Sequence, residues 1–354
     1  MNPLLVVVAV ALVFGLLITF HEMGHLLVAK ALGVKVLEFN VGFGPPLLQW
    51  GKGETRYGLR VIPLGGYVRL AGIDDGETGP RAFTSKPVWR RALIIVAGSV
   101  TNLVLPFFLL FGAGVLEIGG PLRVVSYSPG KPADVSGMPL NAEILSVDGQ
   151  DLQSPYRMRQ LINGSGGRTV TVRYRDPQTG AVDTKALSPY QVDGQWRIGI
   201  STRGGGFDLV GEASDAGTRY GQMVTGTLDG LASLASGRIP GGLTGPCGPS
   251  GPVGIVRATA EAASGGVATL LGIAAFISFN LGILNLMPLP ALDGGRLVFI
   301  LLEGVRRRPI NPLYEQRVHY TGLIALLSLM VLISINDVAR LGTPFADLIS
   351  GCAG

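Results

Sequence analysis

Two histidines and a glutamate near the start of the chain stand at a spacing that can bind and use a metal ion. His21, Glu22 and His25 form the sequence HEMGH. On a helix, residues four apart project from one face, so both imidazoles can hold one ion while Glu22 lies beside them. A Zn²⁺ held in this way acidifies a water molecule, and the glutamate can take its proton and pass it to a leaving amine. This is the chemistry of a hydrolase.

The segment around these residues is otherwise apolar, which makes their presence informative. A charged group at bilayer depth costs roughly 2.5 to 3.5 kcal/mol, so such groups are seldom there without a purpose. The alternative is a pair of histidines bonded inside a helix bundle, with Glu22 in a local ion pair. The chain has only three histidines, so this spacing is improbable by chance, and we favour the metal site.

A catalytic zinc site usually has three protein ligands. The remaining histidine, His319, is expected in a loop beside Arg317, outside any membrane span. Asp293 is the better candidate, because it follows a Pro-x-Pro that must end a helix, and irregular backbone at membrane depth is tolerated where it lines a cavity. An Asp-Gly-Gly sequence alone would suit a turn. Beside an incomplete HExxH, Asp293 is the predicted third ligand.

The elements that position these residues are predicted to be membrane helices. The chain is 47% hydrophobic and 15% charged, which is more apolar than an ordinary soluble domain. The first apolar run lacks the basic start and the clear cleavage site of a signal peptide. Four runs are long enough to span a bilayer: Leu4–Leu27, Ala92–Leu116, Val267–Leu286, and Gly322–Ile335 with its flanks. We predict a polytopic α-helical membrane protein with about four transmembrane helices in the lipid bilayer.

Basic residues predict the orientation of these helices. They gather between the first two spans and between the last two, and short loops this basic stay in the cytoplasm. Both termini and the long segment between the second and third spans are then extracytoplasmic, with the active site towards the cytoplasmic side. These loops explain the net charge of +5, so we predict no nucleic-acid partner. Cys247 and Cys352 suggest neither a disulfide framework nor a metal cluster.

Several short motifs together resemble one known family. HExxH in the first helix and N-x-x-P-x-P-x-L-D-G in a later one resemble the site-2 proteases, which are intramembrane zinc metalloproteases. Four further pieces, in this order, resemble the RseP-like bacterial branch (regulator of sigma-E protease): GFGP at Gly42–Pro45, IPLGGYV at Ile62–Val68, AGSVTN ending at Asn102 and SGPVGI at Ser250–Ile255.

This resemblance implies a role for each site residue. His21, His25 and Asp293 would bind Zn²⁺ and Glu22 would be the general base. Residues that would bind or stabilise the substrate backbone are Asn102, Asn280, Asn285, Pro288 and Pro290. A substrate helix must be unwound to reach the metal, and its freed backbone groups then need partners inside the protein. Ordinary hydrogen bonding between helices is the alternative role for the asparagines.

The resemblance also implies a substrate class and a location. The substrates would be single-span membrane proteins already shortened on their outer side, such as anti-sigma factors or remnant signal peptides, in regulated intramembrane proteolysis. The location would be the bacterial cytoplasmic (inner) membrane. The first catalytic half would cover residues 1–118 and the second would cover 267–354.

The first catalytic half contains a loop, about residues 36–70, whose pattern predicts four short β-strand segments separated by glycine and proline. In the family this is a membrane-associated β-sheet. Its exposed edge could add the substrate as a further strand; the alternative is a hairpin that only plugs the bundle.

The outer segment resembles a single PDZ domain over residues 119–203, a β-rich α+β fold with one amphipathic helix at Pro155–Ile162. It would bind a peptide by strand addition or exclude substrates with bulky outer parts. Residues 204–266 would hold an amphipathic helix, about Ala213–Ala235, and a Gly/Pro-rich linker. The fold class expected is therefore a polytopic helical membrane protein with a β-sheet loop and an inserted PDZ domain.

Two other functions were weighed against a protease. A metal transporter needs ion ligands along a path through the membrane, whereas the sequence indicates only one compact group of ligands. A catalytically silent PDZ-bearing membrane scaffold would be expected to have lost Glu22 or a ligand. The chain keeps all four residues, which favours the zinc metalloprotease.

Overall fold

The computed structural model describes residues 3–51, 53–73, 77–152, 154–192, 194–206, 208–238 and 250–339. The chain forms two compact units. One comprises Met1–Leu109 with Gln222–Gly354, and the other is Leu110–Gly221; we call them the membrane unit and the β-domain. Cys247, Cys352 and the middle of the predicted linker lie outside the described residues.

Among the described residues, four helices are long and apolar enough to cross a membrane, by length and composition. They are α1 (Pro3–Ala31), α2 (Val88–Leu116), α7 (Val267–Leu286) and α9 (Pro312–Ala339). The prediction of a polytopic helical membrane protein with a β-rich insertion is therefore confirmed. The other longer helices are α5 (Leu209–Ala235), α6 (Pro252–Ser264) and α8 (Asp293–Arg306). The sequence analysis did not predict α6, which occupies the end of the expected linker.

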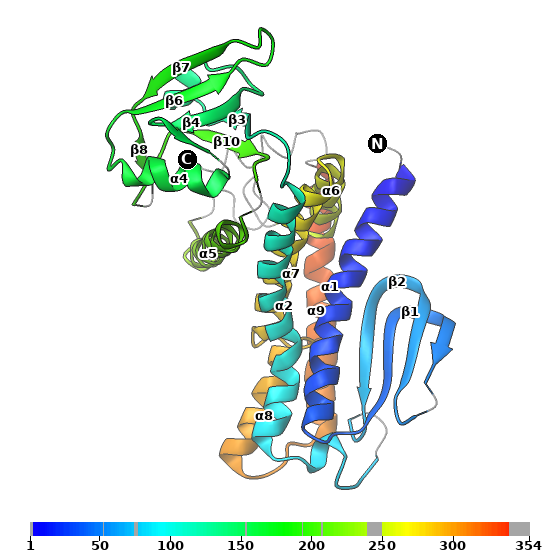
Figure 1. The fold of residues 1–354 in the computed structure, drawn as a ribbon. Coiled ribbons are helices and arrows are strands. Elements are labelled where there is room, and N and C mark those ends of the chain that lie inside the picture. Colours follow the sequence, from blue (N-terminus) through cyan, green and yellow to red (C-terminus); the bar gives the residue numbers. More distant parts are fainter. Residues whose placement is uncertain are drawn as a thin grey trace. The chain divides into compact units, whose positions relative to one another are not determined.

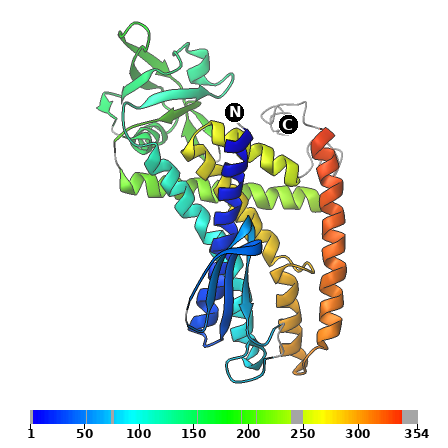
Figure 2. The same ribbon diagram turned by 90° about the vertical axis from the view of Figure 1, so that its right-hand side faces the viewer.

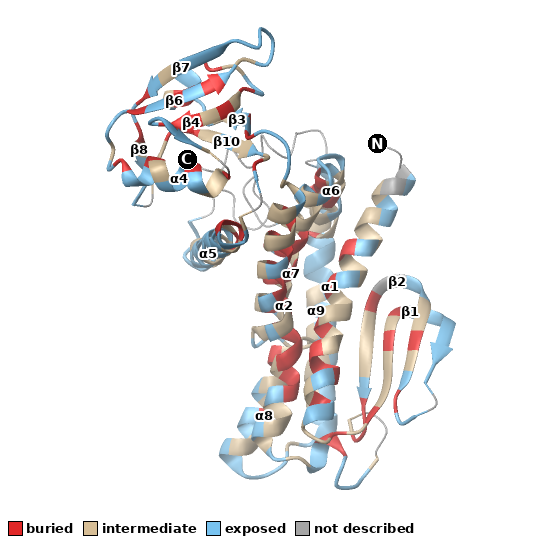
Figure 3. Cartoon of the chain, viewed as in Figure 1, coloured by how far each residue is buried: buried red, intermediate tan, exposed pale blue. Residues whose placement is uncertain are grey.

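Small residues let α1, α2 and α7 pack closely. A methyl group added at Gly24 of α1 would lie 2.5 Å from the Ala97 carbonyl oxygen of α2, and one added at Gly282 of α7 would lie 3.0 Å from the Ser99 carbonyl. Packing of this kind is typical of membrane helices, where contact and not water drives association. Buried residues concentrate where α1 and α2 run side by side (Figure 3).

Strands β1 (Val36–Trp50) and β2 (Arg56–Leu70) form an antiparallel pair in which both strands bend. Phe39 pairs with both Val68 and Tyr57. The two strands therefore make four segments, which match the four β runs expected from the sequence and lie in the order 66–70, 36–41, 56–60, 46–50. The pair lies beside α1 (Figure 1).

A glycine is required where β1 bends. Gly42 has φ +90°, and a methyl group there would lie 2.5 Å from the Ile62 carbonyl oxygen. A side chain would be both strained and obstructed at this position. Part of the GFGP motif is thus explained by the shape of the sheet.

Helix α9 begins earlier than its apolar run. The Asn311 side chain accepts a hydrogen bond from the Leu313 amide at 3.0 Å, and Pro312 suits a first helical position, so the helix starts well before Gly322. The expectation that His319 lies in a loop outside any span was therefore wrong, since His319 is in α9. Figure 2 shows α9 standing alongside α8.

Polar contacts join the end of α9 to α6, and α2 to α8. Near its end, the buried Asp337 carboxylate accepts hydrogen bonds from the amides of Gly251, at 3.2 Å, and Gly254, at 2.8 Å, at the start of α6. These amides have no partner within their own helix, and an acid at this end is favourable. Near the start of α2, Arg91 Nη1 lies 2.6 Å from Glu303 Oε2 of α8.

The β-domain is built on a six-stranded antiparallel sheet in the order β10-β3-β4-β6-β7, with β5 paired to β4. Along β6 the side chains of Val170, Val172 and Tyr174 are buried and their neighbours are exposed. Helix α4 (Pro155–Gly164) adds Met158 and Ile162 to the same core. The strands are β3 (Arg123–Tyr127), β4 (Glu143–Val147), β5 (Gln150–Asp151), β6 (Val170–Arg175), β7 (Val182–Leu187) and β10 (Ile200–Arg203).

Outside this sheet the β-domain has a small hairpin and two helices. The hairpin pairs β8 (Tyr190–Val192) with β9 (Gln195–Arg197). The helices are α3 (Pro132–Val135) and α4 (Pro155–Gly164), which covers the helix expected at Pro155–Ile162. The Ser154 side chain caps α4 by accepting from the Arg157 amide at 3.2 Å, as a serine before a first-turn proline does.

Candidate metal centre

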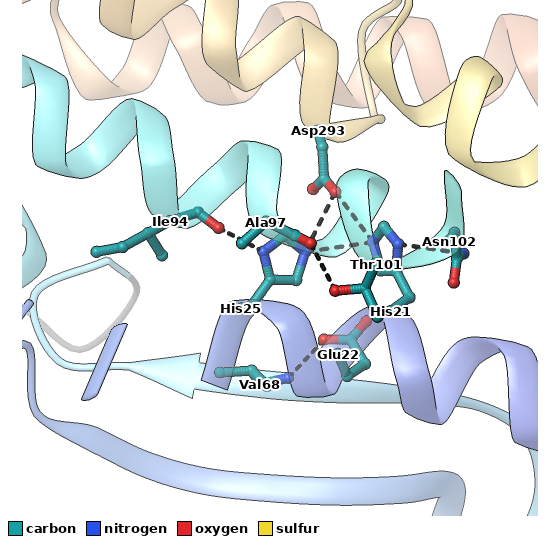
Figure 4. Close-up of polar contacts among 9 residues, drawn as sticks. All are labelled: His21, Glu22, His25, Val68, Ile94, Ala97, Thr101, Asn102 and Asp293. Atoms are coloured by element: carbon teal, nitrogen blue, oxygen red, sulfur yellow. Dashed lines mark hydrogen bonds and ion pairs between the residues drawn. The ribbon is translucent and has the colours of Figure 1, made fainter. Parts of the chain in front are cut away.

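The three predicted ligands come from two distant parts of the chain and meet in the membrane unit. His21 and His25 lie one turn apart on α1, and Asp293 begins α8. Asp293 Oδ2 lies 3.0 Å from His21 Nε2 and 3.2 Å from His25 Nε2, and the two Nε2 atoms are 3.2 Å apart (Figure 4). Both histidines are buried.

These residues fit a zinc ion. Ligand bonds of about 2.0 to 2.1 Å in a tetrahedral arrangement place neighbouring donor atoms about 3.3 Å apart, close to the three separations seen here. In addition, Asp293 Oδ2 is buried and forms no hydrogen bond with any described residue, despite its short distances to both imidazoles. Two imidazole nitrogens and a carboxylate oxygen that face one another at these distances are the arrangement that a shared cation would stabilise.

The second ring nitrogen of each histidine is also engaged. His25 Nδ1 lies 2.8 Å from the Ile94 carbonyl oxygen, so it donates its proton there and leaves Nε2 free to bind a metal. His21 Nδ1 lies 3.4 Å from the Asn102 amide nitrogen, while Asn102 Oδ1 is buried with no partner among the described residues. Rotating this amide by half a turn satisfies the oxygen and lets it accept from His21 in the same way.

A glycine of α2 makes room for the two imidazoles, and the sequence analysis missed its role. A methyl group added at Gly98 would lie 2.7 Å from His25 Cε1 and 2.9 Å from His21 Cε1. Real Cβ atoms do not approach other atoms so closely. The AGSVTN motif contained the signal, because it holds both Gly98 and Asn102, but only tertiary packing shows what the glycine faces.

Glu22 is held by the β-sheet. Its Oε2 accepts a hydrogen bond from the Val68 amide at 3.0 Å, and the Cβ position of Gly66 lies 3.5 Å from Glu22 Cγ. Val68 belongs to an edge segment of the sheet, which therefore runs past the carboxylate. The carboxylate keeps a second oxygen for chemistry beside the ligands.

Asp293 is positioned by a tight crossing of α7 and α8. Helix α7 ends at Leu286 and α8 begins at Asp293, with Leu292 as its N-cap. A methyl group at Gly294 would lie 2.5 Å from the Leu286 carbonyl oxygen, and one at Gly295 would lie 2.9 Å from the Leu289 carbonyl carbon. The two glycines after Asp293 let α8 start against the end of α7.

The other predicted site residues are not all at the centre. Asn102 is fully buried against His21. Asn280 donates to the Phe276 carbonyl of its own helix at 2.8 Å, while Asn285 lies in the last turn of α7. Pro288 and Pro290 lie between α7 and α8. Binding of substrate by these five residues stays a prediction.

Comparisons with known proteins show the family of this chain. Residues 9–329 match the model of peptidase family M50. The chain belongs to peptidase family M50, the site-2 protease family. A Clostridium perfringens relative is 32% identical, over 92% of this chain and 96% of that protein. Zinc metalloprotease RasP of Shouchella clausii is 28% identical, over 96% of this chain and 100% of that protein.

This M50 peptidase is thus a metalloprotease, a hydrolase, and an integral membrane protein. Among solved structures it is similar to the PDZ domain of an SdrC-like protein from Listeria monocytogenes, with a TM-score of 0.21 and 21% identity, over 23% of this chain and 86% of that one. A likeness at this level supports no conclusion about the β-domain, and its assignment as a PDZ domain stays a prediction.

Proposed function

We propose that this M50 peptidase is an intramembrane-cleaving zinc metalloprotease that hydrolyses peptide bonds in the membrane segments of single-span proteins. The observation that carries this proposal is that His21 and His25, with Glu22 alongside, lie on a helix able to cross a membrane and meet Asp293 at the start of α8. Buried titratable groups in such helices are costly and are retained for function.

The three ligands would hold Zn²⁺ through His21 Nε2, His25 Nε2 and Asp293 Oδ2. Bound zinc supplies Lewis acidity, which acidifies water and stabilises negative charge on the substrate carbonyl oxygen. Glu22 takes a proton from the attacking water and delivers it to the amine that leaves. The Val68 amide holds the carboxylate in place during both transfers.

The sheet edge beside Glu22 suits an extended substrate. Residues 66–70 pair on one side with β1 and have no strand partner on the other side among the described residues. A substrate strand added there would be recognised through hydrogen bonds to its backbone and would be kept extended, as hydrolysis requires. Asn102, Asn280, Asn285, Pro288 and Pro290 are proposed to bind or stabilise the backbone of the unwound substrate.

We further propose the bacterial cytoplasmic membrane as the location, with both termini and the β-domain outside and the metal centre towards the cytoplasm. The basic loops between the helices support this orientation. Substrates would be remnants already shortened on their outer side, such as anti-sigma factors or signal peptides. As a PDZ domain, the β-domain would bind a peptide of the substrate or exclude bulky outer parts.

The test uses the purified full chain in detergent with a single-span substrate. We expect cleavage by the wild type, loss of cleavage with a zinc chelator and recovery on adding Zn²⁺. Glu22→Gln should bind zinc as the wild type does and lose at least about 100-fold in kcat. The matched control is Glu261→Gln, an exposed acid on α6 paired with Arg257, which should cleave normally. Zinc and substrate binding without cleavage by the wild type would instead support a silent scaffold.

A further inference from the structure

The last helix, α9, supplies no metal ligand and no general base, yet it contacts the loop that carries Asp293. This loop, residues 287–292, joins α7 to α8. His319 Nδ1 accepts a hydrogen bond from the Ala291 amide at 2.9 Å. The bonded amide is two residues before Asp293, so the position of α9 and the position of the ligand are linked by a single short path.

Ala291 is the point in this loop that most needs outside support. Its φ is 73°, in the left-handed region that residues other than glycine rarely adopt, because Cβ crowds the backbone there. Such a conformation persists only where surrounding contacts impose it. The hydrogen bond from the Ala291 amide to His319 is a contact of this kind.

A second contact from the same face of α9 holds Pro290, the residue before Ala291. Gly322 lies three residues after His319, so both project towards the loop. A methyl group at Gly322 would lie 3.0 Å from Pro290 Cγ and 3.1 Å from the Pro290 carbonyl carbon. The glycine therefore lets Pro290 sit directly against the helix, next to the bonded amide.

Packing limits the movement of the His319 ring. It packs against Phe299 of α8, with ring centroids 5.6 Å apart. Its buried Nε2 lies 3.9 Å from Glu315 Oε1, one turn earlier on α9, and forms no hydrogen bond with any described residue. Because Nδ1 accepts a hydrogen bond, the proton of the neutral ring is on Nε2. The ring therefore presents a fixed acceptor to the loop.

We propose that His319 is a positioning residue for the metal centre: by binding the Ala291 amide, with Pro290 seated on Gly322, it fixes the loop that sets the Asp293 carboxylate opposite His21 and His25. The proposal rests on the proposed zinc site. It gives α9 a function in the active site, since movement of this helix would shift Asp293 relative to the ligands on α1.

The test compares three substitutions of His319 in the full chain in detergent. In His319→Asn the side-chain oxygen is bonded to the γ carbon, as Nδ1 is, and so keeps an acceptor near the same place. His319→Gln moves its amide one carbon further out, and His319→Leu has no acceptor. The probes are Zn²⁺ alone, competed with a chromophoric chelator, and the visible absorption of the Co²⁺-loaded protein.

We expect the Gln and Leu variants to bind Zn²⁺ about 10 to 100 times more weakly, the usual effect of losing a residue that orients a ligand. Their Co²⁺ spectra should change, and kcat should fall with little change in KM. His319→Asn should restore all three properties. Gly322→Ala, which pushes Pro290 away while leaving His319 intact, should give the same defects as the Leu variant.

Equal zinc affinity and equal Co²⁺ spectra in the wild type and the Gln and Leu variants would overturn the proposal, as would an Asn variant as defective as the Gln variant. A lower thermal midpoint with unchanged zinc affinity would show a packing role only, and would also overturn it. If the wild type itself binds no Zn²⁺, the proposed function fails together with this inference. Normal zinc binding and cleavage in every His319 variant would refute the inference alone.

Discussion

Gly98→Ala should damage the metal centre while leaving the fold intact. The added methyl group would lie 2.7 Å from His25 Cε1 and 2.9 Å from His21 Cε1. Ordinary contact between carbon atoms needs about 3.5 to 4.0 Å, so one or both rings must move by about 1 Å. A working metal site tolerates errors of only about 0.2 Å in its ligand distances.

From this displacement we expect Gly98→Ala to weaken Zn²⁺ affinity at least about 100-fold, which corresponds to about 2.7 kcal/mol. Cleavage of the single-span substrate should fall at least as far at limiting zinc. The overlap also costs about 1 to 3 kcal/mol of overpacking, partly offset by the preference of a helix interior for alanine over glycine, about 0.5 to 1 kcal/mol. We therefore expect the zinc-free protein to lose at most about 2.5 kcal/mol of stability and to remain folded while its Zn²⁺ affinity is lost.

The matched control is Gly272→Ala in α7, where an added methyl group meets nothing within 4 Å. It makes the same chemical change in a membrane helix away from the ligands and should leave zinc affinity unchanged. Chelator competition measures the affinity of both variants, and thermal unfolding in detergent measures their stability. The reasoning is refuted if Gly98→Ala binds Zn²⁺ as tightly as Gly272→Ala does.

Three further predictions concern stability. Asp337→Ala removes the acceptor for two amides at the start of α6 and should cost about 2 kcal/mol, seen as a lower thermal midpoint, with Asp337→Asn intermediate. Glu303→Ala leaves Arg91 largely buried without its partner and should cost about 3 kcal/mol; Glu54→Ala, which breaks a more exposed pair, should cost less than about 1 kcal/mol. In the β-domain, burial and then the hydrogen bond to a neighbouring carboxylate raise the pKa of Tyr174 from 10.0 to about 12. Because the folded form holds this proton longer, the resulting stabilisation is complete below about pH 10 and is lost as the pH rises through 12. Tyr174→Phe should remove one late-titrating tyrosine from the ultraviolet titration curve.

Much of the architecture could be predicted from the sequence because membrane insertion leaves a strong local signal. A run of about twenty apolar residues has few stable places other than a bilayer, and the predicted runs overlap all four candidate spans of the structure. The error at His319 arose where that signal is weak, since α9 begins in a polar stretch with Asn311 and Pro312.

The chemistry of the candidate site could also be predicted from local spacing. His21 and His25 share a face of any helix that contains them, and Asp293 was found because a two-histidine site lacks a ligand. Short helices such as α6 and α8 were not predicted, because their residues are neither apolar enough nor regular enough to stand out from a loop.

By itself, the sequence determined which residues could bind a metal and which segments could cross a membrane, since both follow from residue type and spacing along one element. Only the tertiary structure decided how the ligands are held: Gly98 gives the imidazoles space, Val68 binds Glu22, and His319 supports the loop before Asp293. These contacts join residues far apart in the sequence: Glu22 and Val68 are separated by 46 positions, His25 and Gly98 by 73, and Ala291 and His319 by 28. No local pattern encodes them, because they depend on which surfaces meet when the helices and the sheet pack together.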